Sequence, residues 1–222
     1  MLSYVFLNKC VACGCIQTDG KPVCDSCKKT LYRITGIRCE YCGREILHCS
    51  CLRRRNIFSR NISVYRYDGS ASNIVKRFKI GKLTQLAVYI SSEMSILIKE
   101  EYGDIKFDCM TFVPSSRFKD MRRGFSHTKL IADRISNDLK IPNLSLLKRK
   151  FGTKEQKGQS ARNRVINVRD KYRAVRDVSG MKILLIDDVI TTGSSLNECA
   201  RMLKKAGASE VFCATFASTY KK

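Results

Sequence analysis

The sequence lacks a long apolar run, a typical signal-peptide pattern in its first residues and a balance between acidic and basic residues. No stretch approaches the ~18 uninterrupted apolar residues of a transmembrane helix, so we expect none. The first ten residues, MLSYVFLNKC, place no basic residue ahead of their short apolar run, which is atypical of a signal peptide. These absences favour a cytoplasmic protein.

The shortage of acidic residues makes the chain strongly basic. It contains 20 Asp and Glu against 42 Lys and Arg, and its formal net charge is +22. A positive field of this size favours phosphate-bearing partners such as nucleotides, nucleic acid or lipid head groups. The alternative is solvated surface charge that recognises no particular partner.

Cysteine is abundant, but its arrangement argues against disulfides. Nine of the 12 cysteines lie in the first 51 residues, in paired spacings. In a reducing cytosol such pairs indicate metal binding, with a disulfide or redox role as the alternative. Cys109, Cys199 and Cys213 adjoin apolar runs and are expected in the core.

The first set of metal ligands begins with a C-x-x-C-G unit and ends with a second C-x-x-C. It consists of Cys10, Cys13, Cys24 and Cys27, and four thiolates at this spacing close a tetrahedral zinc site. Cys15 is left over and is expected to be a small apolar residue beside the site.

The second set also begins with C-x-x-C-G but ends irregularly. Cys39, Cys42 and Cys51 are three of its ligands, and either Cys49 or His48 is the fourth. We favour Cys49 because a thiolate offsets more of the metal's charge. Residues 1–55 would then form a small double zinc ribbon that depends for its folding on two structural Zn²⁺ ions.

The most informative segment is residues 183–195, I-L-L-I-D-D-V-I-T-T-G-S-S. It predicts a buried strand, two carboxylates, a turn of small residues and the start of an amphipathic helix. Ligands of an open parallel sheet bind at the carboxyl ends of its strands, where such a turn and the helix N-terminus can hold an anion. The segment resembles the phosphoribosyl pyrophosphate (PRPP) motif of type I phosphoribosyltransferases. It is not a Walker P-loop, because no G-K-[ST] follows.

In this interpretation the acids and the turn hold different parts of PRPP. Asp187 and Asp188 accept the ribose hydroxyls or bind a hydrated Mg²⁺. The residues that hold the 5′-phosphate are Thr191, Thr192, Gly193, Ser194 and Ser195. The alternative is an ordinary strand–turn–helix whose acids are solvated caps.

The remaining patterns predict an α/β domain over residues 56–222, a parallel sheet flanked by helices. Strands are expected within residues 56–69 and at 107–113, and helices at roughly 70–79 and 84–99. The second strand opens into a P-S-S-R turn at the same sheet edge as the acids. This loop is a candidate site for the pyrophosphate of PRPP, and the alternative is a basic surface loop. The candidate residues are Ser115, Ser116, Arg117 and Arg123, with Arg122 as the alternative to Arg123.

Residues 148–176 are the most charged stretch, with 11 Lys and Arg against two acids. Their glycines and polar residues predict a long mobile loop that closes over a ligand or contacts a polyanion. Arg162, Arg164 and Arg169 are the candidate contacts to nucleic acid.

Four features occur in order along the chain: two C-x-x-C-G ribbons, an R-R-G-F-S-H segment, the basic loop Q-K-G-Q-S-A-R-N-R, and L-L-I-D-D-V-I-T-T-G-S-S. This order resembles the competence protein F family of bacteria, double zinc ribbon plus phosphoribosyltransferase proteins. The resemblance covers nearly the whole chain. It implies a role in natural transformation, in which members assist the uptake of single-stranded DNA across the inner membrane.

The resemblance also implies partners, a location and roles for single residues. The partners would be PRPP, single-stranded DNA and other DNA-uptake proteins, with the chain cytoplasmic or peripheral at the inner membrane. In the resemblance, a threonine at position 191 is similar to the motif of orotate-type phosphoribosyltransferases. Purine phosphoribosyltransferases that act on hypoxanthine or guanine carry an aspartate at this position. Family members commonly have R-G-F-N-Q where this chain has R-G-F-S-H, so His127 is either a ligand-site residue or a structural group. Two alternatives to this role are an active transferase that uses PRPP with an unknown acceptor and a regulator that senses PRPP without turnover.

Overall fold

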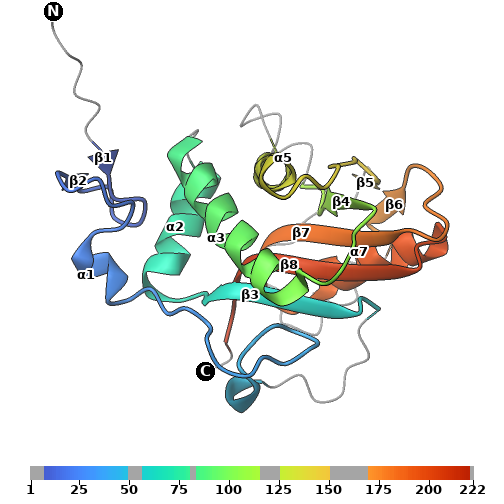
Figure 1. The fold of residues 1–222 in the computed structure, drawn as a ribbon, viewed down its shortest axis with the longest axis horizontal. Helices are drawn as coiled ribbons and strands as arrows, with labels where there is room; N and C mark the ends of the chain where they lie inside the picture. The colour runs from blue at the N-terminus through green and yellow to red at the C-terminus, as the bar shows by residue number, and fades with distance from the viewer. Residues whose placement is uncertain (1–7, 50–56, 81–83, 116–125, 151–169, 221–222) are drawn as a thin grey trace, which may run out of the picture.

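We describe the fold from a computed structural model, which describes residues 8–49, 57–80, 84–115, 126–150 and 170–220. The central element is a four-stranded parallel sheet (Figure 1) with the order β3-β8-β7-β4. Its strands are β3 (Arg60–Arg66), β8 (Glu210–Ser218), β7 (Lys182–Ile190) and β4 (Cys109–Phe112). The expected parallel sheet flanked by helices is confirmed.

Helices cover both faces of this sheet. One face carries α2 (Gly69–Ile80), α3 (Thr84–Tyr102) and α5 (His127–Leu139), and the other carries α7 (Ser194–Lys205). Leu184 and Ile186 join the first core, whereas Ile183 and Leu185 join the second. Burial on both faces explains why β7 is a continuous apolar run and does not alternate with polar residues.

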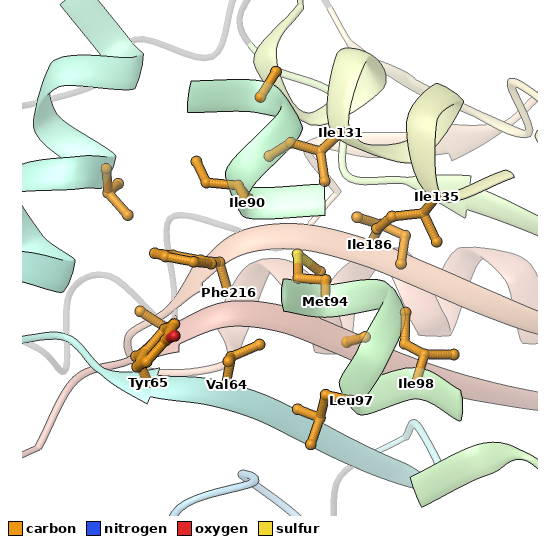
Figure 2. Packing of buried hydrophobic residues seen from close by; sticks show 14 of the residues in the cluster. Val64, Tyr65, Ile90, Met94, Leu97, Ile98, Ile131, Ile135, Ile186 and Phe216 are labelled. Carbon is orange, nitrogen blue, oxygen red and sulfur yellow. The ribbon is translucent and has the colours of Figure 1, made fainter. Parts of the chain in front are cut away.

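Figure 2 shows the first core, where side chains of the sheet meet those of α3 and α5. Met94, Leu97 and Ile98 of α3 recur at helical spacing and are almost fully buried. Ile131 and Ile135 of α5 lie one turn apart and complete the layer. These helices fix the position of the sheet edge at which the strands end.

The strand β7 extends further than the sequence pattern indicates. It includes Asp187 and Asp188 because its pairing with β8 continues to Ile190, which lies opposite Ser218. The acids therefore belong to the last residues of the strand and do not follow it. The helix that follows the turn agrees with expectation, and Gly207, just beyond the C-terminus of α7, has a positive φ of 96°.

The expected loop at residues 148–176 is not a loop at its two ends, which belong to short strands. Its ends form a two-stranded antiparallel sheet of β5 (Leu147–Arg149) and β6 (Tyr172–Ala174). Leu147 and Tyr172 anchor this hairpin because both are buried in the second core with α7. Residues 151–169, which include Arg162, Arg164 and Arg169, lie outside the described residues.

The cysteine-rich segment contains little regular structure: β1 (Asn8–Lys9), β2 (Ile16–Gln17), α1 (Asp25–Lys28) and the 3-10 turn η1 (Ile46–His48). Its two halves join different cores. Cys10 lies in the first core beside α2, and Cys39 and Cys42 lie in the second. No helix in the described part of the chain is long and apolar enough to cross a membrane.

Candidate functional site

The turn at residues 191–195 connects β7 to the N-terminus of α7. Gly193 has φ 75° and ψ 0°, a left-handed conformation that glycine adopts without strain. The hydroxyl groups of Thr192 and Ser194 lie 2.8 Å apart, so two hydrogen-bonding side chains meet at the mouth of the turn. The turn is at least partly exposed and lies at the positive end of a 12-residue helix, an arrangement suited to binding an anion.

The two acids at the end of β7 have different surroundings. Asp188 is buried, and its carboxylate forms an ion pair of 2.8 Å with the ammonium group of Lys79 from α2. Asp187 lies toward the second core, where burial, reinforced by the Asp187 carboxylate, raises the pKa of the thiols of Cys199 and Cys213. Consecutive residues of a strand face opposite sides of a sheet, which accounts for this difference.

The proton affinity of Asp187 is strongly perturbed. Burial, reinforced by the neighbouring Asp188 carboxylate, raises the pKa of Asp187 to about 8, although Lys79 opposes the shift. Burial tends to lower the pKa of Lys79, but Asp188 outweighs it and the pKa is raised. The protonated form of Asp187 is therefore favoured more than in a free carboxyl, and a bound cation would favour the ionised form.

The loop expected to hold pyrophosphate is described only at its start. Ser115 follows β4 at the same sheet edge as Asp187, because β4 and β7 are parallel neighbours. Its hydroxyl group lies 3.4 Å from that of Ser126. Ser116, Arg117 and Arg123 lie outside the described residues.

The first cysteine cluster has the geometry of a tetrahedral metal site. The sulfur atoms of Cys10, Cys13, Cys24 and Cys27 all lie within 4.8 Å of one another. Those of Cys13 and Cys24 are 3.8 Å apart. Metal–sulfur bonds of about 2.3 Å in a tetrahedron separate the sulfurs by about 3.8 Å, so this donor set fits zinc.

The charge state of the first cluster also suits a cation. Burial opposes ionisation of Cys10, yet hydrogen bonds from the backbone N–H groups of Cys13, Cys24 and Ala12 lower its thiol pKa to about 6. Burial instead raises the pKa of Cys27 to about 12. Cys10 thus ionises readily, whereas Cys27 resists ionisation. We therefore expect Cys27 to lose its proton only when a cation binds to the cluster.

The second cluster is smaller within the described residues. Cys39, Cys42 and Cys49 come together, and the sulfur atoms of Cys42 and Cys49 are 3.7 Å apart. His48 instead points its Nε2 toward Glu45 at 3.8 Å and its ring toward Tyr220. Cys51 lies outside the described residues. The structure thus places Cys49, and not His48, beside the other thiols.

Comparisons with known proteins find relatives that match most of the chain. Competence protein F of Haemophilus influenzae is 29% identical over 224 residues, which cover 93% of this chain and 95% of that protein. Competence protein ComFC of Bacillus subtilis is 28% identical over 202 residues, covering 86% and 81% of the two chains. Residues 122–222 also match the phosphoribosyl transferase domain family. The chain is thus similar, over most of its length, to the competence proteins F and ComFC.

Other relatives carry a different name. The DNA utilization protein YhgH of Escherichia coli K12 is 26% identical over 198 residues, which cover 85% of this chain and 87% of that protein. Among solved structures, a glutamine PRPP amidotransferase from B. subtilis is 22% identical with a TM-score of 0.43, covering 63% of this chain and 30% of that one.

Lys79 is a residue of the candidate site that the sequence patterns did not reveal. It lies in the last turn of α2, where a basic residue also suits the helix dipole, and only the fold brings it to Asp188. His127 is buried and packs edge to face on Phe78, with ring centroids 4.8 Å apart. This environment favours a structural role for His127.

Proposed function

We propose that the protein is a PRPP-binding, zinc-containing factor that assists the uptake of single-stranded DNA in natural transformation. The observation that carries the proposal is the partly exposed 191–195 turn, held at the N-terminus of α7 beside the two carboxylates of β7. This arrangement would bring sites for a phosphate and for ribose hydroxyls to one sheet edge.

PRPP would be held by groups with complementary chemistry. Backbone N–H groups of the turn and the hydroxyls of Thr191, Thr192, Ser194 and Ser195 would bind the 5′-phosphate, and Gly193 permits the turn. Asp187 and Asp188 would accept the ribose hydroxyls. A bound Mg²⁺ would neutralise pyrophosphate charge, and the ammonium group of Lys79 would offset the charge of the buried Asp188 carboxylate in the absence of the ligand. Ser115, with Ser116, Arg117 and Arg123 beyond the described residues, would contact the pyrophosphate.

The two cysteine clusters would each hold one structural Zn²⁺ ion. In the first, the four-thiol set already has tetrahedral sulfur spacing. In the second, Cys51 would complete the set of Cys39, Cys42 and Cys49. Residues 1–55 would then be the zinc-ribbon module, and residues 56–222 the PRPP-binding domain.

The DNA part of the proposal rests on charge and on relatives. The net charge is +22, and relatives are named competence and DNA utilization proteins. Arg162, Arg164 and Arg169 would contact phosphates of a single strand. A cytoplasmic location at the inner membrane, beside other DNA-uptake proteins, would bring the chain to the incoming strand.

An active phosphoribosyltransferase with an unknown acceptor is the second candidate. The perturbed pKa of Asp187 favours it, because strongly shifted carboxyls concentrate at reacting sites. Thr191 stands where six-oxopurine enzymes carry an aspartate, so the acceptor would not be hypoxanthine or guanine. Release of pyrophosphate from PRPP, assayed with a panel of bases and with single-stranded DNA, distinguishes turnover from binding or sensing alone.

Titration calorimetry with PRPP and Mg²⁺ tests the proposed site. Asp187→Ala combined with Asp188→Ala should weaken binding at least ~10-fold, because two acceptors for the ribose hydroxyls are removed. Asp177→Ala is the matched control, since Asp177 caps the Ser179 backbone N–H and hydroxyl group on the surface. Equal affinity in the double variant and the control would contradict the assignment.

A further inference from the structure

The second cysteine cluster is connected directly to the 191–195 turn by one side chain. Arg44 follows the C-x-x-C-G unit, and its Nη2 donates a 2.8 Å hydrogen bond to the carbonyl oxygen of Thr191. Arg44 is only 7% exposed. A residue of the cysteine-rich segment therefore touches the first residue of the turn, far away in the sequence.

The backbone of Arg44 is part of the cysteine knuckle itself. Its carbonyl accepts the Cys39 N–H at 2.6 Å, and the Gly43 N–H donates to the Cys39 carbonyl at 2.9 Å. Gly43 has φ +69°, and a Cβ there would lie 2.8 Å from the carbonyl oxygen of Asn61 in β3. The knuckle is thus pressed against the edge strand, so the Arg44 side chain starts from a fixed point.

A second segment holds Thr191 from the other side. The Thr219 N–H donates to the Ile190 carbonyl at 3.0 Å, and its hydroxyl reaches the Thr191 carbonyl at 3.4 Å. Tyr220 follows, and its hydroxyl oxygen accepts the Glu45 N–H at 3.3 Å. The knuckle and the segment after β8 therefore enclose the start of the turn together.

An arginine at position 44 is less favourable for stability than an apolar side chain that would fill the same space. Within the described part of the chain, the buried Nε of Arg44 makes no hydrogen bond. A buried cation with an unsatisfied donor is unfavourable, and an apolar side chain of similar volume would often be better for stability. The hydrogen bond to Thr191 is therefore the feature that distinguishes arginine at this position.

The effect of that hydrogen bond follows from peptide geometry. In a trans peptide the C=O and the following N–H point in opposite directions. Holding the Thr191 carbonyl toward Arg44 turns the Thr192 N–H away from the knuckle. If this peptide flipped, the Thr191 carbonyl oxygen would replace the Thr192 N–H on the side of the turn. A carbonyl oxygen at that position would repel a phosphate.

We propose that Arg44 is a positioning residue that fixes the Thr191–Thr192 peptide for phosphate binding and so makes that binding depend on an intact second cysteine cluster. The inference rests on the proposed function for its ligand, but the fixed turn is a property of the free protein. Oxidation of the cluster, or loss of its metal, would then weaken phosphate binding without changing any group that touches the ligand.

Two measurements on the full-length protein test the proposal. Arg44→Met should raise amide hydrogen exchange in the 191–195 turn about 10-fold and weaken binding of ribose 5-phosphate and of PRPP about 10- to 100-fold. Arg44→Lys retains the charge and a donor and should recover part of both effects. Arg38→Met is the control, since Arg38 is similarly buried in the same segment but binds Glu101 and the Ile34 carbonyl.

The outcomes separate the two proposals. Unchanged exchange and affinity in Arg44→Met, or equal effects in Arg38→Met, would refute the positioning role. If the wild-type protein binds neither ribose 5-phosphate nor PRPP, the proposed function fails while the exchange measurement still decides the role of Arg44. Removing metal with a chelator should raise exchange in the turn of the wild-type protein but add little in Arg44→Met, because the connection is already broken.

Discussion

The raised pKa of Asp187 has a direct consequence for stability, which Asp187→Asn makes measurable. The carboxyl has a pKa of 3.8 as a free group and about 8 in the folded protein. Below about pH 4 both states hold the proton and the residue contributes nothing to their difference. Between these two pKa values the unfolded chain releases the proton and the folded protein retains it, so stability falls as the pH rises. Above about pH 8 the decrease is complete.

The size of the effect follows from the shift. Each pKa unit corresponds to about 1.4 kcal/mol, which gives an upper limit of roughly 6 kcal/mol. Asp187 retains some exposure, and solvent screening reduces this to about 2 kcal/mol. Asp187→Asn removes the titration, so the variant should match the wild type near pH ~4 and exceed it by about 2 kcal/mol at pH ~8.5.

Urea unfolding at several pH values between about 5 and 8.5, with zinc present throughout, measures this difference. The titration of the cysteines cancels because the variants are compared at the same pH. Asp177→Asn is the control: a hydrogen bond from the Ser179 hydroxyl lowers the pKa of Asp177 below its usual value, so the stability difference of this variant should stay constant over this pH range. A stability difference for Asp187→Asn that does not grow with pH would refute the reasoning.

Three further predictions concern the turn, the metals and the DNA. Gly193→Ala should lower the free energy of unfolding by about 1–2 kcal/mol, measured by thermal unfolding, because alanine is strained at a positive φ of 75°. The strain is the expected cause because, among the described residues, the added Cβ meets only Ile190, at 3.6 Å. Gly36→Ala is the control and should be close to neutral, because Gly36 does not have a positive φ. Metal analysis should find about two Zn²⁺ per chain, and a value of about one would mean that the second cluster holds no metal. Neutralising Arg162, Arg164 and Arg169 should weaken single-strand binding uniformly across sequences and flatten its salt slope by up to ~0.7 for each phosphate that the variant no longer neutralises. Binding that is absent or independent of salt would remove nucleic acid from the account.

The sequence was most informative where the signals are local. The strand, turn and helix at residues 183–205 follow one another without interruption, and the apolar spacing of Leu196, Cys199 and Leu203 sets the buried face of α7. The cysteine pairs were equally readable, because short spacings bring two thiols to one point before any long-range contact forms.

What the sequence did not reveal depends on distant partners. The end of β7 is set by its pairing with β8, which no local pattern contains. The ion pair of Lys79 with Asp188 and the hydrogen bond of Arg44 to Thr191 each join segments that are far apart in the chain. The short strands β5 and β6 were also missed, since three residues within a highly charged stretch carry too little periodicity.

The most direct test of the central claim is an amide NMR titration of the zinc-loaded protein with ribose 5-phosphate and Mg²⁺. If the 191–195 turn holds the 5′-phosphate, the largest shift changes should fall on the N–H groups of Thr192, Gly193, Ser194 and Ser195, and ribose without phosphate should not reproduce them. Saturable binding whose largest changes lie elsewhere, or no change at the turn at millimolar ligand, would contradict the account.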